Sequence, residues 1–285
     1  MLHSLAGCWR RARHGARPLA PVPSSTSVVQ IRDFASHADR AACVELQELT
    51  WGRGFTEKIP AAMLLVAQKT GGVVAGAFDD DGTLLGFVFG VTGIKDGVLM
   101  HWSDMLAVRP EMRGQHLGER LKAYQRDRCR ALGVRTIYWT YDPLVAKNAH
   151  LNLNRLGARA DEYVASMYGD ATNSPLQGDM PTDRFIAAWP VDPAEAATAL
   201  DALPPDLPLV VGPNATEGPL VDARQIGVRI PRDISAIAAT DLATARRWRA
   251  ATRRAFLHYL PLGYHVRGFV PDADGGTYLL TRREA

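Results

Sequence analysis

The segment 105–118 combines residue types that suit the binding of a phosphate group. An apolar run ends at Val108 and is followed closely by a proline, which cannot donate a hydrogen bond to a sheet. Arg113 and Gly114 come next, and a helical pattern of apolar residues begins at Leu117. A strand, a short turn and a helix place free backbone N–H groups at a helix N-terminus, which carries about half a positive charge. This arrangement predicts a site for a pyrophosphate.

Two common nucleotide-binding motifs do not fit this segment. A nucleotide P-loop ends in Gly-Lys followed by Ser or Thr, which is absent here. A dinucleotide fingerprint has three glycines and an acidic residue about twenty positions later. The turn and helix start contain only Gly114 and Gly118, and the next strand ends before Asp142, which is further along than that.

The loop resembles the pyrophosphate loop of the GNAT superfamily of CoA-dependent N-acyltransferases. Arg-Gly at 113–114 matches the central pair of that loop, and Leu-Gly at 117–118 matches its helix start. Glu111 stands where the family usually has Gln or Arg. His116 replaces a second small residue, and its side chain crowds the phosphates unless it points outward. The resemblance implies that the phosphates of CoA are held by Arg113, Gly114, Gln115, His116, Leu117 and Gly118.

The chain after this loop also follows the GNAT order of elements. A run rich in β-branched and aromatic residues at 136–141 predicts a strand, and a helix at 148–157 ends at a glycine. Matching spacings continue as far as Trp248, so the resemblance covers nearly the whole chain after residue 27. The spacing looks like that of one particular branch, whose members are mostly described as predicted acetyltransferases.

One position of the family pattern lacks its usual residue. In many GNAT proteins a tyrosine in the helix that follows this strand protonates the departing CoA thiolate, whereas this chain has Leu153 there. Either another residue, such as Asn152, Tyr141 or Tyr168, takes over this role, or the thiolate leaves unassisted.

The chemistry implied by the resemblance is direct attack of an amine on the thioester of acetyl-CoA or another acyl-CoA. The pantetheine arm would pair with the strand that precedes the loop, at Leu106, Ala107 and Val108. The backbone N–H of Leu106 would polarise the thioester carbonyl as an oxyanion donor. No covalent intermediate is needed, and Cys129 lies on the apolar stripe of a helix.

Three polar residues are the remaining candidates for the site. Strand alternation puts Asp104 on the same face as Leu106 and Val108, where a carboxylate can take the proton of the attacking amine. An ion-paired surface carboxylate is the alternative. Asn148 and Asn152 share one helix face and are poor helix formers, which favours contact with pantetheine or substrate.

Composition is that of an ordinary globular protein. The chain has 285 residues, of which 47% are hydrophobic and 22% are charged. No apolar run reaches the roughly 20 residues that span a bilayer. The three cysteines are widely spaced and the histidines form no cluster, so the pattern predicts neither a disulfide framework nor a metal site.

The net charge of +3 comes from the first residues of the chain. Residues 1–26 contain four arginines and no acidic residue, and the remainder is nearly neutral, which argues against nucleic-acid binding. The segment 1–26 is typical of a disordered leader, of a translated stretch upstream of the true start, or of a mitochondrial transit peptide. We therefore expect a cytoplasmic protein, or one of the mitochondrial matrix if the leader is a targeting segment.

The pattern of elements predicts an α/β (α+β) fold: a mixed, mostly antiparallel sheet flanked by helices, with a smaller α/β module at the C-terminus. The predicted parts are the leader 1–26, a GNAT-like domain at 27–191, a linker at 192–208, and a module at 209–285 that packs on the first domain or on a second copy of the chain. Expected strands lie at 27–32, 72–78, 84–91, 97–108, 135–141, 184–191, 227–230, 264–270 and 277–280, and expected helices at 38–49, 60–69, 148–157 and 241–259.

The sequence thus predicts an N-acetyltransferase that acts on a small-molecule primary amine, such as an amino acid, with no metal, membrane or nucleic-acid partner. A non-catalytic CoA-binding or interaction module with the same fold is the alternative, suggested by His116 and Leu153. The arginines of the helix at 241–259 also suit nucleic acid, but a packing stripe on the opposite side makes a solvated surface the simpler interpretation.

Overall fold

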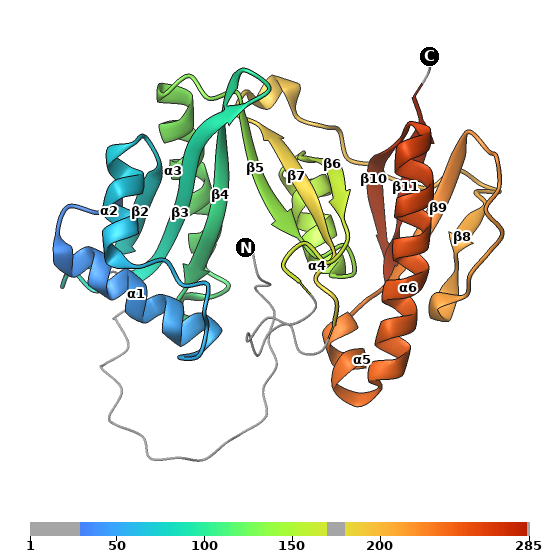
Figure 1. Cartoon of the computed structure of the whole chain (residues 1–285), viewed down its shortest axis with the longest axis horizontal. Coiled ribbons are helices and arrows are strands. Elements are labelled where there is room, and N and C mark those ends of the chain that lie inside the picture. The colour runs from blue at the N-terminus through green and yellow to red at the C-terminus, as the bar shows by residue number, and fades with distance from the viewer. Residues whose placement is uncertain (1–28, 170–179, 284–285) are drawn as a thin grey trace.

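The larger of two β-sheets occupies the first part of the chain (Figure 1). The computed structural model describes residues 29–169 and 180–283, so the predicted leader 1–26 lies outside the described residues. The sheet has seven strands in the order β1-β2-β3-β4-β5-β7-β6. Only β4 and β5 are parallel neighbours, and the sheet is therefore mixed and mostly antiparallel, as predicted. The strands are β1 Gln30–Asp33, β2 Val73–Phe78, β3 Leu84–Lys95, β4 Val98–Val108, β5 Thr136–Tyr141, β6 Arg159–Val164 and β7 Arg184–Pro190.

Helices cover both faces of this sheet. Helices α1 (His37–Trp51) and α2 (Ala61–Lys69) pack on one face, through a core that includes Met105 and Ala107 of β4. Helix α3 (Leu117–Ala131) packs on the other face, against Leu106 and Val108. The short helix α4 (Ala146–Ala149) and a π-helical segment (His150–Arg155) contribute to the same core as α3. The two faces are called the α1–α2 face and the α3 face below.

The first helix shows how local sequence sets an element boundary. The side chain of Ser36 accepts a hydrogen bond from the backbone N–H of Asp39, and the carboxylate of Asp39 accepts from the N–H of Ser36 in return. This capping box satisfies donors that the first helical turn leaves free. The guanidinium of Arg32 in β1 also pairs with Asp39 at 2.7 Å, which ties the helix start to the edge strand.

The C-terminal part forms a second, four-stranded sheet in the order β10-β11-β9-β8. Its elements are β8 Leu209–Val211, β9 Gln225–Pro231, α5 Ile234–Thr240, α6 Leu242–Tyr259, β10 Tyr264–Asp272 and β11 Gly275–Arg282. Short 3₁₀ turns lie at Pro110–Met112, Pro193–Glu195, Pro213–Ala215 and Leu260–Leu262. The sequence did not predict β8 or α5, which are too short to show a clear period.

The two sheets share one continuous apolar core. Phe185 of β7 lies edge-on to Phe256 of α6, with 4.7 Å between ring centroids. Tyr278 of β11 contacts both rings, and its hydroxyl donates to the carbonyl of Pro143 at 2.8 Å. The stretch predicted as a linker is also tied to the first part of the chain, since the amide of Ala197 donates to the carbonyl of Gly157, just before β6. Within the described residues, no helix is both long and apolar enough to cross a membrane.

Candidate active site

The sheet loses its pairing between β4 and β5. The two strands form only three register pairs, from Met100 with Thr136 to Trp102 with Tyr138, although β4 continues for six more residues. The residues beyond these pairs, 103–108 of β4 and 139–141 of β5, are called the seam. Strands that diverge in this way leave backbone N–H and C=O groups without sheet partners on the facing edges.

The ladder between β3 and β4 shows which backbone groups turn toward the seam. The amide of Arg109 donates to the carbonyl of Leu85 at 2.8 Å, so these residues form a hydrogen-bonded pair. In an antiparallel ladder such pairs alternate with pairs that make no hydrogen bonds to each other. Counted back along the register from Arg109, Leu106 and Val108 belong to the pairs that make no hydrogen bonds to β3. Their N–H and C=O groups therefore point away from β3 and toward the seam, where the sequence predicts the oxyanion donor and the pantetheine contacts.

Asp104 lies in a β-bulge that alters the alternation assumed from the sequence. Met105 stands opposite Phe89 and Ser103 opposite Gly90, so Asp104 is an extra residue in β4. The prediction that Asp104 shares a face with Leu106 and Val108 is wrong for this reason. Asp104 influences the pKa values of Glu57 and Tyr168, which places it among the polar groups of the α1–α2 face.

The predicted phosphate loop precedes α3 and is open to solvent. Arg113, Gly114, Gln115 and His116 are exposed, while Leu117 packs into the core at the helix start. No side chain caps the N-terminus of α3. Free N–H groups of the first helical turn and an exposed guanidinium thus occur together, and they fit a pyrophosphate.

His116 has a left-handed backbone conformation, with φ of 57°. This conformation explains why a small residue is usual at this place, because side chains other than those of Gly, Asn, Asp and His rarely adopt it. The imidazole points into solvent, with 71% of the side chain exposed, and its Nδ1 lies 3.3 Å from the carboxylate of Glu119. The His116 side chain thus points outward, which is the direction that leaves room for the phosphates.

The predicted helix at 148–157 is irregular. It starts as α4 and continues as a π-helix from His150 to Arg155, which changes the spacing of side chains along it. The expectation that Asn148 and Asn152 share one face by α-helical spacing does not apply to this geometry. Asn148 is half-buried, whereas Asn152 is buried and accepts a hydrogen bond from Trp139 Nε1 at 3.3 Å.

A chain of buried polar side chains lies at the closed end of the seam on the α3 face. Lys122 of α3 donates to the hydroxyl of Ser103 at 2.8 Å and to Gln125 Oε1 at 3.3 Å, and its ammonium lies over the ring of Trp139. Gln125 bonds to His101, which in turn bonds to a threonine of β3. Burial lowers the pKa of Lys122 to about 7 and, together with Lys122, the pKa of His101 to about 3. No pattern in the sequence indicated this buried lysine.

The α1–α2 face of the seam carries groups that can move a proton. The hydroxyls of Tyr168 and Thr140 lie 3.0 Å apart, and Arg184 lies beside the Tyr168 ring at 5.5 Å. Burial raises the pKa of Tyr168 and that of Glu57, and Asp104 adds to both effects. One carboxylate oxygen of Glu57 is buried without a hydrogen-bond partner. Carboxyl and phenol groups with perturbed pKa values are typical of acid–base sites.

Other residues considered from the sequence lie away from these groups. The ring of Tyr141 is buried among the aromatic residues that join the two sheets, and its hydroxyl has no hydrogen-bond partner. Cys129 is buried, which raises the pKa of its thiol to about 12 and makes it inert as a nucleophile. Leu153 is buried in the core. In the described parts of the chain, no group of His, Cys, Asp and Glu side chains could hold a metal ion.

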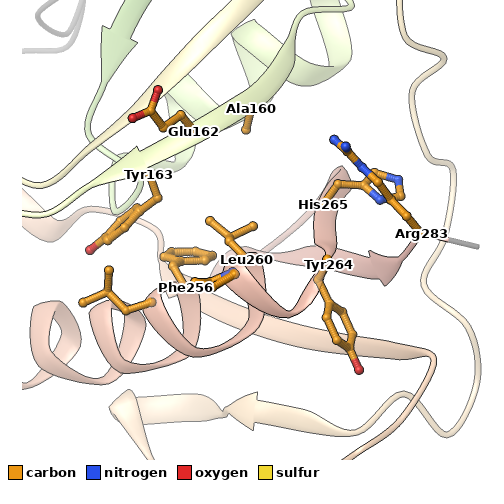
Figure 2. A pocket seen from close by; sticks show the side chains of 11 residues that line it. Ala160, Glu162, Tyr163, Phe256, Leu260, Tyr264, His265 and Arg283 are labelled. Carbon is orange, nitrogen blue, oxygen red and sulfur yellow. The ribbon is translucent and has the colours of Figure 1, made fainter. Parts of the chain in front are cut away.

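A separate cavity of about 320 Å³ lies between β6 and the C-terminal part of the chain. Figure 2 shows the rings of Tyr163 and Phe256 toward one end of it and His265 with Arg283 toward the other. None of the seam or loop residues lines this cavity. It is therefore distinct from the site described above.

One family model and several solved structures are similar to parts of this chain. The model of the acetyltransferase (GNAT) family matches residues 41–157, which include the seam, the loop and the π-helix. A phosphinothricin acetyltransferase from Sinorhizobium meliloti, solved with acetyl-CoA, is 19% identical (TM-score 0.46), and the match covers 62% of this chain and 96% of that one. A putative acetyltransferase from Salmonella typhimurium, also solved with acetyl-CoA, is 19% identical (TM-score 0.46; 63% and 99%). A GNAT-family acetyltransferase from Streptococcus pneumoniae is 17% identical (TM-score 0.45; 58% and 100%).

A comparison with curated proteins gives no match. The likeness to this family therefore depends on the sequence match, and the structural likenesses add nothing about substrate. Residues 41–157 match the model of the acetyltransferase (GNAT) family.

Proposed function

We propose that the protein is an N-acetyltransferase that transfers the acetyl group of acetyl-CoA to the primary amine of a small molecule. The observation that carries this proposal is the seam. It turns the backbone N–H and C=O groups of Leu106 and Val108 toward the diverging strand β5, in line with the exposed loop at the start of α3. An extended pantetheine arm needs such groups, and a pyrophosphate needs such a loop.

The residues divide into two sets on either side of the seam. Arg113 and the N-terminus of α3 would hold the phosphates, with Asn148 near the pantetheine arm. The N–H of Leu106 would stabilise the negative charge that develops on the thioester oxygen. On the α1–α2 face, Asp104 or Glu57 would take the proton of the attacking amine, and Tyr168 would protonate the leaving thiolate. Asn152, which accepts a hydrogen bond from Trp139, would act on this site as a positioning residue.

Reversal of the charge at Arg113 tests whether the loop before α3 binds CoA. Arg113→Glu should abolish the thermal stabilisation by CoA and the release of free thiol from acetyl-CoA, because a carboxylate repels the phosphates. Arg232→Glu is the matched control, since this exposed arginine follows β9 in the C-terminal sheet. An Arg113→Glu protein that responds to CoA as fully as the control would show that the loop does not bind the cofactor.

A non-catalytic CoA-binding module is the second candidate, and Leu153 at the position of the usual tyrosine favours it. The two functions differ in one measurement. A module of this kind would be stabilised by CoA but would release no thiol from acetyl-CoA with any amine, whereas the enzyme would do both.

A further inference from the structure

The side chain of Lys122 reaches the point at which β4 and β5 separate. The register of these parallel strands ends with Trp102 opposite Tyr138, so that one further step along both strands gives Ser103 and Trp139. The amine of Lys122 donates to the Ser103 hydroxyl at 2.8 Å and lies 4.3 Å from the centroid of the Trp139 ring. A single side chain of α3 therefore contacts both strands at the first position of the seam.

A directional series of hydrogen bonds fixes the position of this amine. Lys122 donates to Oε1 of Gln125 at 3.3 Å, so the amide nitrogen of Gln125 is the donor to Nε2 of His101, 3.0 Å away. Nδ1 of His101 then carries the ring proton and donates to the hydroxyl of Thr92 at 3.0 Å, and this hydroxyl donates to the carbonyl of Gly71 at 2.7 Å. Because each group has one role in the series, the amine has little freedom to move.

Among the described residues, no carboxylate pairs with Lys122. The titratable groups near it are His101 and Cys129, which are both neutral at pH 7. Burial, together with Lys122, lowers the pKa of His101 to about 3, and burial raises that of Cys129 to about 12. The electron-rich face of Trp139 is then the main partner of a positive charge here. An apolar side chain would fill this place without the cost of desolvating an amine, so the lysine contributes a connection between strands at the expense of stability.

This connection bears on the seam because both of its walls start at the two contacted residues. Leu106, the predicted oxyanion donor, follows Ser103 in β4 just beyond the bulge. On the opposite wall, Nε1 of Trp139 donates to the side chain of Asn152 in the π-helix at 3.3 Å. The place of Lys122 therefore sets how far the two walls lie apart where an extended pantetheine arm would enter.

We propose that Lys122 is a positioning residue for the acyl transfer, which sets the spacing of β4 and β5 through Ser103 on one strand and Trp139 on the other. This inference rests on the proposed function. It predicts that loss of the amine changes stability and cofactor affinity in opposite directions. A residue with a merely structural role would change both in the same direction.

Lys122→Met tests this role, because methionine fills the space of the lysine stem but donates no hydrogen bond. We expect the Kd for acetyl-CoA, measured by titration calorimetry, to rise about tenfold or more, since small displacements of aligned groups are costly. The urea midpoint at pH 7 should rise as well. Lys69→Met, the same change at an exposed site of α2, is the control and should alter neither quantity. A Lys122→Met protein that binds acetyl-CoA as tightly as the wild type would overturn the inference and leave the proposed function intact. Failure of the wild type to bind acetyl-CoA would overturn both.

Ser103→Ala shows whether Lys122 acts through β4. Loss of this hydroxyl should raise the Kd for acetyl-CoA about threefold or more, as expected for one hydrogen bond. It should have no further effect in Lys122→Met, where the contact is already absent. Thr92→Val alters the far end of the same series and should leave the Kd within about twofold of the wild type. Additive effects of Ser103→Ala and Lys122→Met, or a fall of both midpoint and affinity in Lys122→Met, would show that the amine supports the fold and does not set the seam.

Discussion

The ammonium of Lys122 lies 2.8 Å from the hydroxyl of Ser103, at the point where β4 and β5 separate. Its side chain is 4% exposed, and among the described residues it forms no ion pair with a carboxylate. A protonated lysine is costly in such a place, which is why burial lowers its pKa to about 7.

This buried lysine makes stability depend on pH. Between pH 7 and its ordinary pKa of 10.5 the unfolded chain binds the proton and the folded chain does not, so stability rises with pH across this window. Lys122→Met removes the effect. We expect the gain of the variant over the wild type to be about 3–4 kcal/mol larger at pH 7 than at pH 10, measured by urea unfolding. Lys69→Met, at an exposed site, should show no such difference, and equal gains at both pH values would refute the argument.

His116 and Gly114 provide a paired test of backbone strain in the phosphate loop. Both have positive φ, and a side chain at Gly114 would meet open space, so the cost of adding one there is conformational. We expect His116→Gly to stabilise the fold by up to about 1 kcal/mol and Gly114→Ala to destabilise it by about as much. Urea midpoints at constant slope measure both. Destabilisation by His116→Gly would mean that the imidazole makes a contribution beyond its contact with Glu119.

Tyr168 and Tyr141 are distinguished by the face on which each hydroxyl lies. The Tyr168 hydroxyl meets Thr140 on the α1–α2 face, whereas that of Tyr141 is buried in the aromatic core without a partner. Tyr168→Phe should lower kcat about 10- to 100-fold with unchanged KM for acetyl-CoA, as loss of a general acid does. Tyr141→Phe should change kcat less than about twofold, because it removes an unsatisfied polar group. The reverse ranking would assign the proton donor to Tyr141.

The pH dependence of kcat/KM separates Glu57 from Asp104 as the base. A base must be deprotonated to act, and burial raises the pKa of Glu57, so activity limited by Glu57 falls as pH drops through that raised pKa. Glu57→Gln should flatten this acidic limb, whereas Asp104→Asn should shift it to lower pH, because removal of Asp104 removes the charge that helps to raise the pKa of Glu57. Loss of the limb in Asp104→Asn alone would identify Asp104 as the base.

The fragment that ends at Val191 tests whether the first sheet is independent. Truncation exposes Phe185, which is fully buried against Phe256, and removes Arg249 and Arg253 of α6, which pair with Asp142 and Asp183. We expect aggregation, detected by light scattering during refolding. A monomeric fragment that is still stabilised by CoA would show that the aromatic contacts are dispensable.

Local sequence patterns predicted most of the elements and the phosphate loop. Strand and helix periods and the turn residues around Gly114 depend on neighbours in the chain, and these were sufficient for β2 to β5, α1, α2 and α6. The bulge at Asp104 was not predictable, because one inserted residue leaves no mark on an apolar pattern. The π-helix at Asn152 was missed for a similar reason, since α- and π-helices have similar compositions.

The polar groups around the seam depend on contacts between distant residues. Arg249 and Asp142 are 107 residues apart, and Tyr168 and Thr140 are 28 apart. Nothing in the neighbouring sequence indicates that these pairs meet. The alternation rule failed at Asp104, and buried charges such as Lys122 and Arg249 were hidden among ordinary helical residues.

Because β4 and β5 share few hydrogen bonds, we expect the larger sheet to separate between these two strands under mechanical force. Strands β1 to β4 form one plate with α1 and α2, while β5, β7 and β6 are joined by the aromatic residues to the C-terminal sheet (Figure 1). Helix α3 bridges the two plates. In the described part of the larger sheet, the boundary with the fewest strand pairs therefore runs through residues 41–157 and not along the stretch 192–208. Forced unfolding or hydrogen exchange should separate the chain into these two plates, with the proposed acyl site at the line of separation.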